Sequence, residues 1–155
     1  YNPDVHISIL DLPGQLNDAE KNIEKQGFNH RISLHPINLL NFSKPYPKGR
    51  EIIWMSQFLD CFSEKQVVQL ISNAKDAMDE KARLYIMETL WDKQRFEASA
   101  YSLHATSLYF TCVANGNSRM YHSDDMIRLI NQAGLKVDEI HENIGVSHTL
   151  ISCMK

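Results

Sequence analysis

Two strand-like segments stand next to each other at the end of this sequence, whereas every earlier strand-like segment is followed by a helix or a loop. The pair covers residues 135–142 and 147–154, with only residues 143–146 between them. Four residues are too few for the crossover that parallel strands require, so the pair predicts an antiparallel hairpin. The preceding alternation predicts a mostly parallel sheet, so the fold class is α/β with an antiparallel strand added near one edge.

Earlier in the chain, short β-branched segments alternate with helical ones. The expected strands cover residues 5–10, 32–35, 51–56 and 82–87. The expected helices cover residues 15–26, 64–78, 94–113 and 123–132, with Ser63 and Ser123 as N-caps. The third of these helices is broadly apolar, so we expect it to be largely buried from more than one side. Strand-helix alternation places helices on both faces of the sheet.

Charge and composition exclude several classes of protein. The net charge is −3 and the basic residues are scattered, so no basic stripe indicates nucleic-acid binding. No apolar segment approaches the roughly 20 residues of a membrane span, and residues 1–4 do not begin an export signal. Three widely spaced cysteines, Cys61, Cys112 and Cys153, indicate reduced thiols in a cytoplasmic protein. The histidines lack metal-ligand spacing, so no metal is expected.

Ligands of such sheets bind at the carboxyl ends of the strands. The residues there are Asp11, the turn 36–38, the segment 56–60 and the pair 88–89. A carboxylate directly after a strand offers two adjacent acceptor oxygens, which suit the two hydroxyls of a ribose. Asp is also favoured in turns, so position alone leaves both roles open for Asp11.

Several landmarks recur in the order of one family. They are DLP at residues 11–13, the strand 52–56 leading into FLDCFSEKQVVQLI, the strand LYIMET, and AGL before the final hairpin. In this order they resemble the class I S-adenosylmethionine-dependent methyltransferases, specifically the O-methyltransferase family of plant caffeate and bacterial polyketide enzymes. The resemblance covers nearly the whole chain and implies a Rossmann-like sheet.

The resemblance implies a site for S-adenosylmethionine as methyl donor. Asp11 would bind the ribose hydroxyls, and Asn38 would approach the adenine amine through its amide oxygen. Ser56, at the end of the next strand, would also contact the cofactor. A turn role remains the alternative for Asn38.

Two features of the family are missing from this sequence. There is no glycine-rich loop or first strand before residue 5, and no amino-terminal helical dimerisation domain. We therefore expect residues 1–155 to be a partial methyltransferase domain, the carboxyl-terminal portion of a longer enzyme that forms a homodimer through the missing domain. Lack of the first strand would leave two unpaired strand edges, beside residues 5–10 and 51–56.

The family's catalytic base is a His that removes the proton of the acceptor hydroxyl, and Asp60 stands at its position. An ordinary Asp is a weaker base than His by about two to three pK units, so burial between Phe58 and Phe62 would have to raise its pKa. Glu88 matches a Glu that orients the base, whereas the second such Glu falls near Met120 and is missing. The alternative for Asp60 is a residue that favours the start of a helix.

The methyl acceptor implied by the resemblance is a small, hydroxylated and planar aromatic molecule, methylated on oxygen or carbon. The residues expected to line its site are Phe58, Trp91, Tyr101, His104, Tyr121 and His122. Each ring taken singly also suits a hydrophobic core. His104 lies on an apolar face and is expected to be a core histidine, whereas His141 and His148 are expected at the surface.

Two other functions stay open. Without a glycine-rich loop, the chain could be a non-catalytic binding or assembly module that kept the fold. A nucleotide-binding oxidoreductase fragment would also carry an acid after its second strand, but it does not predict the final antiparallel hairpin.

Overall fold

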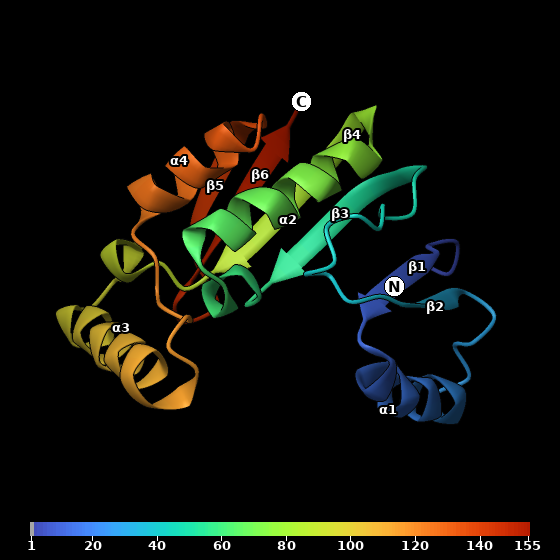
Figure 1. The fold of residues 1–155 in the computed structure, drawn as a ribbon, viewed down its shortest axis with the longest axis horizontal. Helices are drawn as coiled ribbons and strands as arrows, with labels where there is room; N and C mark the ends of the chain where they lie inside the picture. The colour runs from blue at the N-terminus through green and yellow to red at the C-terminus, as the bar shows by residue number, and fades with distance from the viewer. Residues whose placement is uncertain (1) are drawn as a thin grey trace. The chain divides into compact units, whose positions relative to one another are not determined.

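The structure is a computed structural model that describes residues 2–155, and it divides into two compact units, Tyr1–Lys44 and Pro45–Lys155. The first unit is a strand, a helix and a second strand: β1 (Ile7–Asp11), α1 (Pro13–Lys25) and β2 (Ile32–Pro36) (Figure 1). The two strands are parallel and pair Asp11 with Pro36. Their carboxyl ends therefore meet, as the sequence predicted.

The second unit contains a four-stranded sheet in the order β3-β4-β6-β5. Its strands are β3 (Arg50–Ser56), β4 (Met78–Glu88), β5 (Lys136–Ile144) and β6 (His148–Met154). β3 and β4 are parallel, and β6 is antiparallel to both β4 and β5. The predicted hairpin is confirmed, and its second strand lies inside the sheet so that β5 forms the edge.

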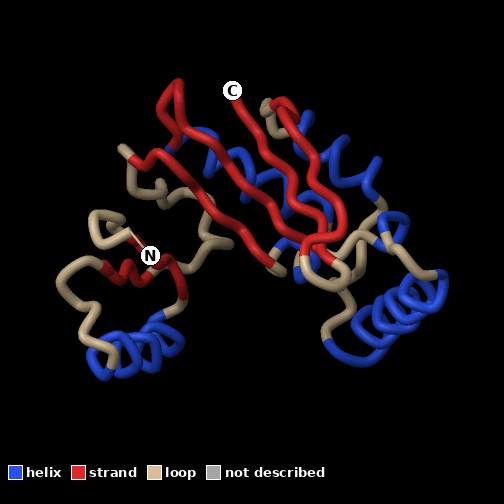
Figure 2. Tube along the Cα trace, turned by 180° about the vertical axis from the view of Figure 1, so that it is seen from behind, coloured by secondary structure: helices blue, strands red, loops and turns tan. Residues whose placement is uncertain are grey.

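Two amphipathic helices cover one face of this sheet. They are α2 (Glu64–Ala77) and α4 (Ser123–Gln132), which lie side by side in front of the strands in Figure 1 and behind them in Figure 2. Their apolar stripes are fully buried, as their spacing predicted: Val67, Leu70, Ile71, Met126, Leu129 and Ile130. On the opposite face, Ile52 and Trp54 of β3 are 59% and 54% exposed. Within Pro45–Lys155, helices therefore cover one face of the sheet rather than both.

The strands of the two units belong to separate sheets. Within the part of the chain that the structure describes, β1 pairs only with β2, and β3 pairs only with β4. This agrees with the prediction of two unpaired strand edges. None of the described helices is long and apolar enough to cross a membrane.

The expected long buried helix over residues 94–113 is wrong in extent and in burial. The segment forms a short 3-10 turn, Trp91–Lys93, then α3 (Glu97–Tyr109) and a π-helical turn, Phe110–Ala114. No residue of α3 is buried. Apolar composition predicted burial, but two hydroxyl side chains of this segment bond the backbone before α4: Ser107 accepts from Met120 N, and Thr111 donates to the Ser118 carbonyl oxygen.

Two predicted element ends also differ. Ser123 is the first residue of α4 rather than its N-cap, because Nδ1 of the preceding His122 accepts the hydrogen bond from Asp124 N at 3.0 Å. β4 begins at Met78 instead of residue 82, because the chain passes from α2 directly into the strand. Ser63 is the N-cap of α2 as predicted, and its N–H donates to Oε1 of Gln66 at 3.0 Å.

Candidate active site

Glu88, the last residue of β4, holds the loop that follows β3. Its side chain is 2% exposed, and Oε1 accepts hydrogen bonds from Phe58 N at 2.9 Å and Leu59 N at 2.8 Å. Oε2 is buried and has no hydrogen-bond partner within residues 2–155. Burial raises the pKa of Glu88 to about 7, with the charge of Asp60 adding to the rise and the two N–H donors opposing it. Glu88 therefore changes protonation close to neutral pH.

The same loop is held from its other side by the segment before α4. The carbonyl oxygen of Asp60 accepts from Arg119 N at 2.9 Å, and the carbonyl oxygen of Phe62 accepts from the Tyr121 hydroxyl at 2.7 Å. Together with the hydrogen bonds to Glu88, these bonds satisfy backbone groups of the short loop that have no partner in a helix or a strand. The loop carrying Asp60 is thus fixed by residues far from it in sequence.

The carboxyl group of Asp60 is partly buried. The rings of Phe58 and Phe62, two positions away on either side of Asp60 in the sequence, pack edge to face with centroids 4.9 Å apart. Burial raises the pKa of Asp60, although the Cys61 thiol, which donates to Oδ1 at 3.5 Å, acts in the opposite direction. The direction is the one that a basic role would need. Burial and the charge of Asp60 raise the pKa of Cys61 to about 11, so this thiol is protonated at neutral pH.

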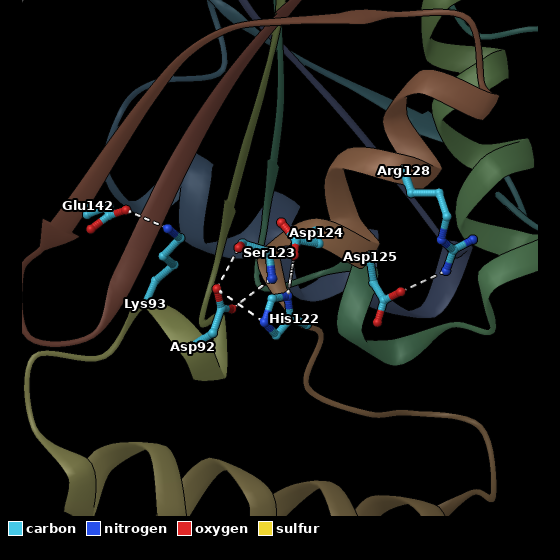
Figure 3. Close-up of polar contacts among 8 residues, drawn as sticks. All are labelled: Asp92, Lys93, His122, Ser123, Asp124, Asp125, Arg128 and Glu142. Atoms are coloured by element: carbon cyan, nitrogen blue, oxygen red, sulfur yellow. Dashed lines mark hydrogen bonds and ion pairs between the residues drawn. The ribbon is translucent and has the colours of Figure 1, made fainter.

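An ion-pair network fastens the start of α2 to α4. Glu64 pairs with Arg119 and, at 3.0 Å, with Arg128. Arg128 also pairs with Asp125 at 2.9 Å (Figure 3). The Arg119 guanidinium lies 4.7 Å from the ring centroid of Tyr121. Partly exposed pairs of this kind each contribute little stability, so the network mainly orients the segment that holds the loop.

Asp92 caps α4 from the turn that follows β4. Its two carboxylate oxygens accept from the N–H and the hydroxyl of Ser123 at 2.7 and 2.5 Å (Figure 3). Nε2 of His122 lies 3.7 Å from the same carboxylate. These residues do not form a nucleophilic triad, because the Ser123 hydroxyl donates to Asp92 and not to His122. Lys93 ties the turn to β5 through Glu142 at 3.0 Å.

The expected acceptor-lining residues are only partly brought together. Trp91 lies between two imidazoles, with its ring 4.5 Å from His104 and 4.7 Å from His122. His104 is exposed, so its assignment as a core histidine is wrong. Tyr101 is 76% exposed, whereas Tyr121 is 2% exposed and uses its hydroxyl on Phe62. Tyr121 thus serves packing, and Tyr101 lies on the outer side of α3.

In the first unit, Asp11 is the last residue of β1, and Asn38 lies two residues after the end of β2. Ile37 N donates to the Asp11 carbonyl oxygen at 2.9 Å, which brings the two turns together. Oδ1 of Asp11 accepts from Leu12 N at 2.7 Å, and Oδ2 has no hydrogen-bond partner within the described residues. The amide oxygen of Asn38 already accepts from Leu40 N at 3.0 Å.

A family profile described as the O-methyltransferase domain matches residues 1–136 of this chain. The chain belongs to this family. The match leaves out only β6 and most of β5, the two strands of the final hairpin. Family membership also decides against the oxidoreductase fragment.

Relatives of this O-methyltransferase domain are distant in sequence. A 3-amino-4-hydroxybenzoate 4-O-methyltransferase of Streptomyces cremeus is 21% identical over 140 residues. The solved structure of the mitomycin 7-O-methyltransferase MmcR matches 99% of the chain with a TM-score of 0.84 and 17% identity. NcsB1, an O-methyltransferase from neocarzinostatin biosynthesis, matches 97% with a TM-score of 0.79 and 18% identity. At these identities the structures establish the fold.

The O-methyltransferase domain is shorter than these relatives. It spans 36% of the Streptomyces cremeus protein and 42% of each of the two solved chains, while 89% to 99% of its own length is matched. The fold is therefore shared over almost the whole of this chain.

Two polar residues of the O-methyltransferase domain, Asp92 and Arg119, were not expected from sequence. Asp92 holds the start of α4, and Arg119 N holds the loop after β3. Gln57 lies in the segment 56–60, which was expected at a ligand-binding strand end, but its contact with His148 was not predicted. His148 was expected at the surface and is half-buried instead. Among residues 2–155, no three His, Cys, Asp or Glu side chains form a metal-binding group.

Proposed function

We propose that this chain is part of an enzyme that transfers a methyl group from S-adenosylmethionine to a hydroxylated acceptor. Membership of the O-methyltransferase domain family supports the reaction class. The observation that carries the proposal is that Glu88, at the carboxyl end of β4, holds the loop after β3 that carries Asp60, through Phe58 N and Leu59 N. Ligands of α/β sheets bind at these ends.

The residues of the first unit fit the cofactor. Oδ2 of Asp11 has no protein partner among the described residues, so the carboxylate can still accept a ribose hydroxyl. Asn38 keeps its amide N–H donors and one lone pair of its oxygen. Ser56, half-buried at the end of β3, is the third proposed contact. NcsB1 was solved in complex with S-adenosylmethionine, which supports this class of ligand.

When bound, the cofactor would supply an electrophilic methyl carbon on a sulfonium sulfur, and transfer of this carbon to the acceptor oxygen would break the carbon–sulfur bond and release S-adenosylhomocysteine. Asp60 is proposed to receive the proton of that oxygen, since burial moves its pKa toward that of a useful base. Glu88 is a positioning residue, because its carboxylate bonds the backbone of the Asp60 loop rather than the Asp60 side chain. An acidic acceptor, such as a phenol, loses its proton more easily, so Asp60 could act as a weaker base.

We propose a small hydroxylated aromatic acceptor. The names of two relatives support this class: one acts on 3-amino-4-hydroxybenzoate, and NcsB1 was solved with 2-hydroxy-5-methyl naphthoic acid. Phe58 with Phe62, and Trp91 with His104, offer flat surfaces for such a ring. Tyr101 and Tyr121 have weaker support, because one is strongly exposed and the other is buried.

The wider setting is proposed from the sequence: the homodimer from the family resemblance, and the other properties from the cysteines, the charge and the lack of a long apolar segment. The proposed whole protein is a cytoplasmic homodimer that acts on a small molecule and binds neither nucleic acid nor membrane. A second function, a non-catalytic binding module, is favoured by one observation: Asp60 stands where the family's base is a His.

Binding and turnover of the full-length protein separate the two functions. Calorimetry with S-adenosylhomocysteine tests donor binding. Incubation of the protein with hydroxylated benzoates and S-adenosylmethionine that carries a labelled methyl group then tests methyl transfer. The enzyme should bind the donor product and release a labelled methyl ether. Binding without transfer to any of the acceptors would favour the binding module, and no binding would contradict both.

A further inference from the structure

Gln57 and His148 form a polar pair at the carboxyl end of β3. Gln57 follows the last residue of β3, and its side-chain amide nitrogen contacts Nε2 of His148, the first residue of β6. The two residues are 91 positions apart. Glu88 pairs with Thr149 across β4 and β6, so His148 lies beside the end of β4 that carries Glu88. The pair is therefore placed at the same strand ends as the proposed catalytic acids.

The backbone of Gln57 is held in an unfavourable conformation. Its φ is 46°, and only one other described non-glycine residue, Asn143 near the end of β5, has a positive φ. Gln57 N donates to the Met87 carbonyl oxygen at 2.8 Å, which keeps the residue in this conformation. Residues other than glycine rarely adopt the left-handed backbone conformation, and those that do concentrate at ligand sites.

The contact determines what the His148 ring can offer. The Gln57 amide nitrogen can only donate, so this contact selects the His148 tautomer in which Nε2 accepts and Nδ1 carries the hydrogen. Nδ1 has no hydrogen-bond partner among residues 2–155, and the side chain is half-buried. His148 therefore presents one oriented and unused N–H donor.

We propose that His148 binds an oxygen of the methyl acceptor through Nδ1–H, with Gln57 holding the ring in that orientation. This inference rests on the proposed methyl transfer. Ionised Asp60 and Glu88 can only accept hydrogen bonds, and the nearby Arg119 is paired with Glu64. His148 supplies the donor that these acids lack. Such a donor suits a phenolate or carboxylate oxygen, which forms stronger hydrogen bonds than a neutral one.

The test uses the full-length protein saturated with S-adenosylhomocysteine and 3,4-dihydroxybenzoate as the probe. Calorimetry measures probe affinity, and ¹⁵N NMR of the histidine rings identifies which His148 nitrogen carries hydrogen. His148→Leu and Gln57→Leu should each weaken probe binding about five- to tenfold, the usual effect of losing one hydrogen bond. His148→Asn keeps an amide N–H close to the position of Nδ1 and should restore most of the affinity.

His141→Leu is the matched control, because His141 is exposed on the same hairpin and its ring bonds Glu139, a residue of the same strand. It should leave probe affinity unchanged, and unchanged S-adenosylhomocysteine affinity shows that each variant is folded. In the unmodified protein, the Nδ1 signal of His148 should shift when the probe binds. If His148→Leu leaves the probe affinity unchanged, or if a protein that binds S-adenosylhomocysteine does not bind the probe, this inference alone is overturned. Failure to bind S-adenosylhomocysteine would overturn the proposed function and this inference with it.

Discussion

The Glu88 carboxylate and the backbone N–H of Leu59, 29 positions apart, are joined by a 2.8 Å hydrogen bond. This bond connects the end of β4 to the loop after β3, and the same oxygen also bonds Phe58 N. The loop that presents Asp60 is therefore positioned by a buried carboxyl group whose charge depends on pH near neutrality.

Glu88 should make the free energy of unfolding fall as pH rises. Its pKa is raised from 4.5 to about 7 in the folded protein, so the native state binds this proton more tightly than the unfolded state. The stabilisation that protonated Glu88 gives the folded protein is complete below about pH 4.5 and is lost as pH rises through about 7. A rise of this size corresponds to about 3 kcal/mol. Glu88→Gln should be more stable than the unmodified protein at pH 8 by up to that amount and similar at pH 4.5.

Urea unfolding of the full-length protein at both pH values measures this difference. Glu97→Gln, on the exposed face of α3, is the control and should change stability little at either pH. If Glu88→Gln is instead less stable at pH 8, the two backbone hydrogen bonds to the carboxylate outweigh the cost of its burial.

Asp60→Asn should remove the proposed proton acceptor while keeping the size of the side chain. The turnover number of the full-length enzyme should fall by about 10²–10⁴, the usual contribution of general base catalysis. Turnover by the unmodified enzyme should rise with pH through the raised pKa of Asp60, and the variant should lose this rise. A pH–rate profile of both proteins measures it. An unaltered profile in a stable variant would leave Asp60 with only a structural role near the start of α2.

Asp92→Ala should destabilise α4, because both the N–H and the hydroxyl of Ser123 lose their acceptor. We expect a loss of about 1–3 kcal/mol, the range for charge-assisted hydrogen bonds. Burial acts to raise the pKa of Asp92, but the Ser123 hydrogen bonds outweigh it and the pKa is lowered. The stabilisation is therefore present above the pKa of an unfolded Asp and is lost as pH falls through the folded value. Thermal melts at pH 7 and pH 3 test both statements, with exposed Asp124→Ala as the control.

Asp11→Ala should weaken donor binding. If its free Oδ2 accepts a ribose hydroxyl, S-adenosylhomocysteine affinity in the full-length protein should fall by about 1–3 kcal/mol. Calorimetry measures the loss, and Asp18→Ala on the exposed side of α1 should not reproduce it. Equal affinity of a folded Asp11→Ala protein would remove Asp11 from the cofactor site.

Local pattern was sufficient for most of the fold. The apolar spacing of α2 and α4, the N-cap at Ser63 and the short link between β5 and β6 each depend on residues a few positions apart. The family landmarks also lie in the chain itself, and they placed Asp60 and Glu88 at strand ends before the fold was known. The apolar spacing, the N-cap and the hairpin link act within one helical turn or one hairpin, so the sequence alone determined these features.

Tertiary packing decided the rest. The apolar composition of α3 predicted burial, but no described neighbour buries it. The bonds from Phe58 and Leu59 to Glu88, from Ser123 to Asp92 and from Gln57 to His148 join residues about 30 to 91 positions apart. A buried polar atom takes the partner that packing brings within about 3 Å, and no local spacing encodes that partner. The sequence therefore determined which acids stand at the strand ends, and only the tertiary structure decided which groups hold them.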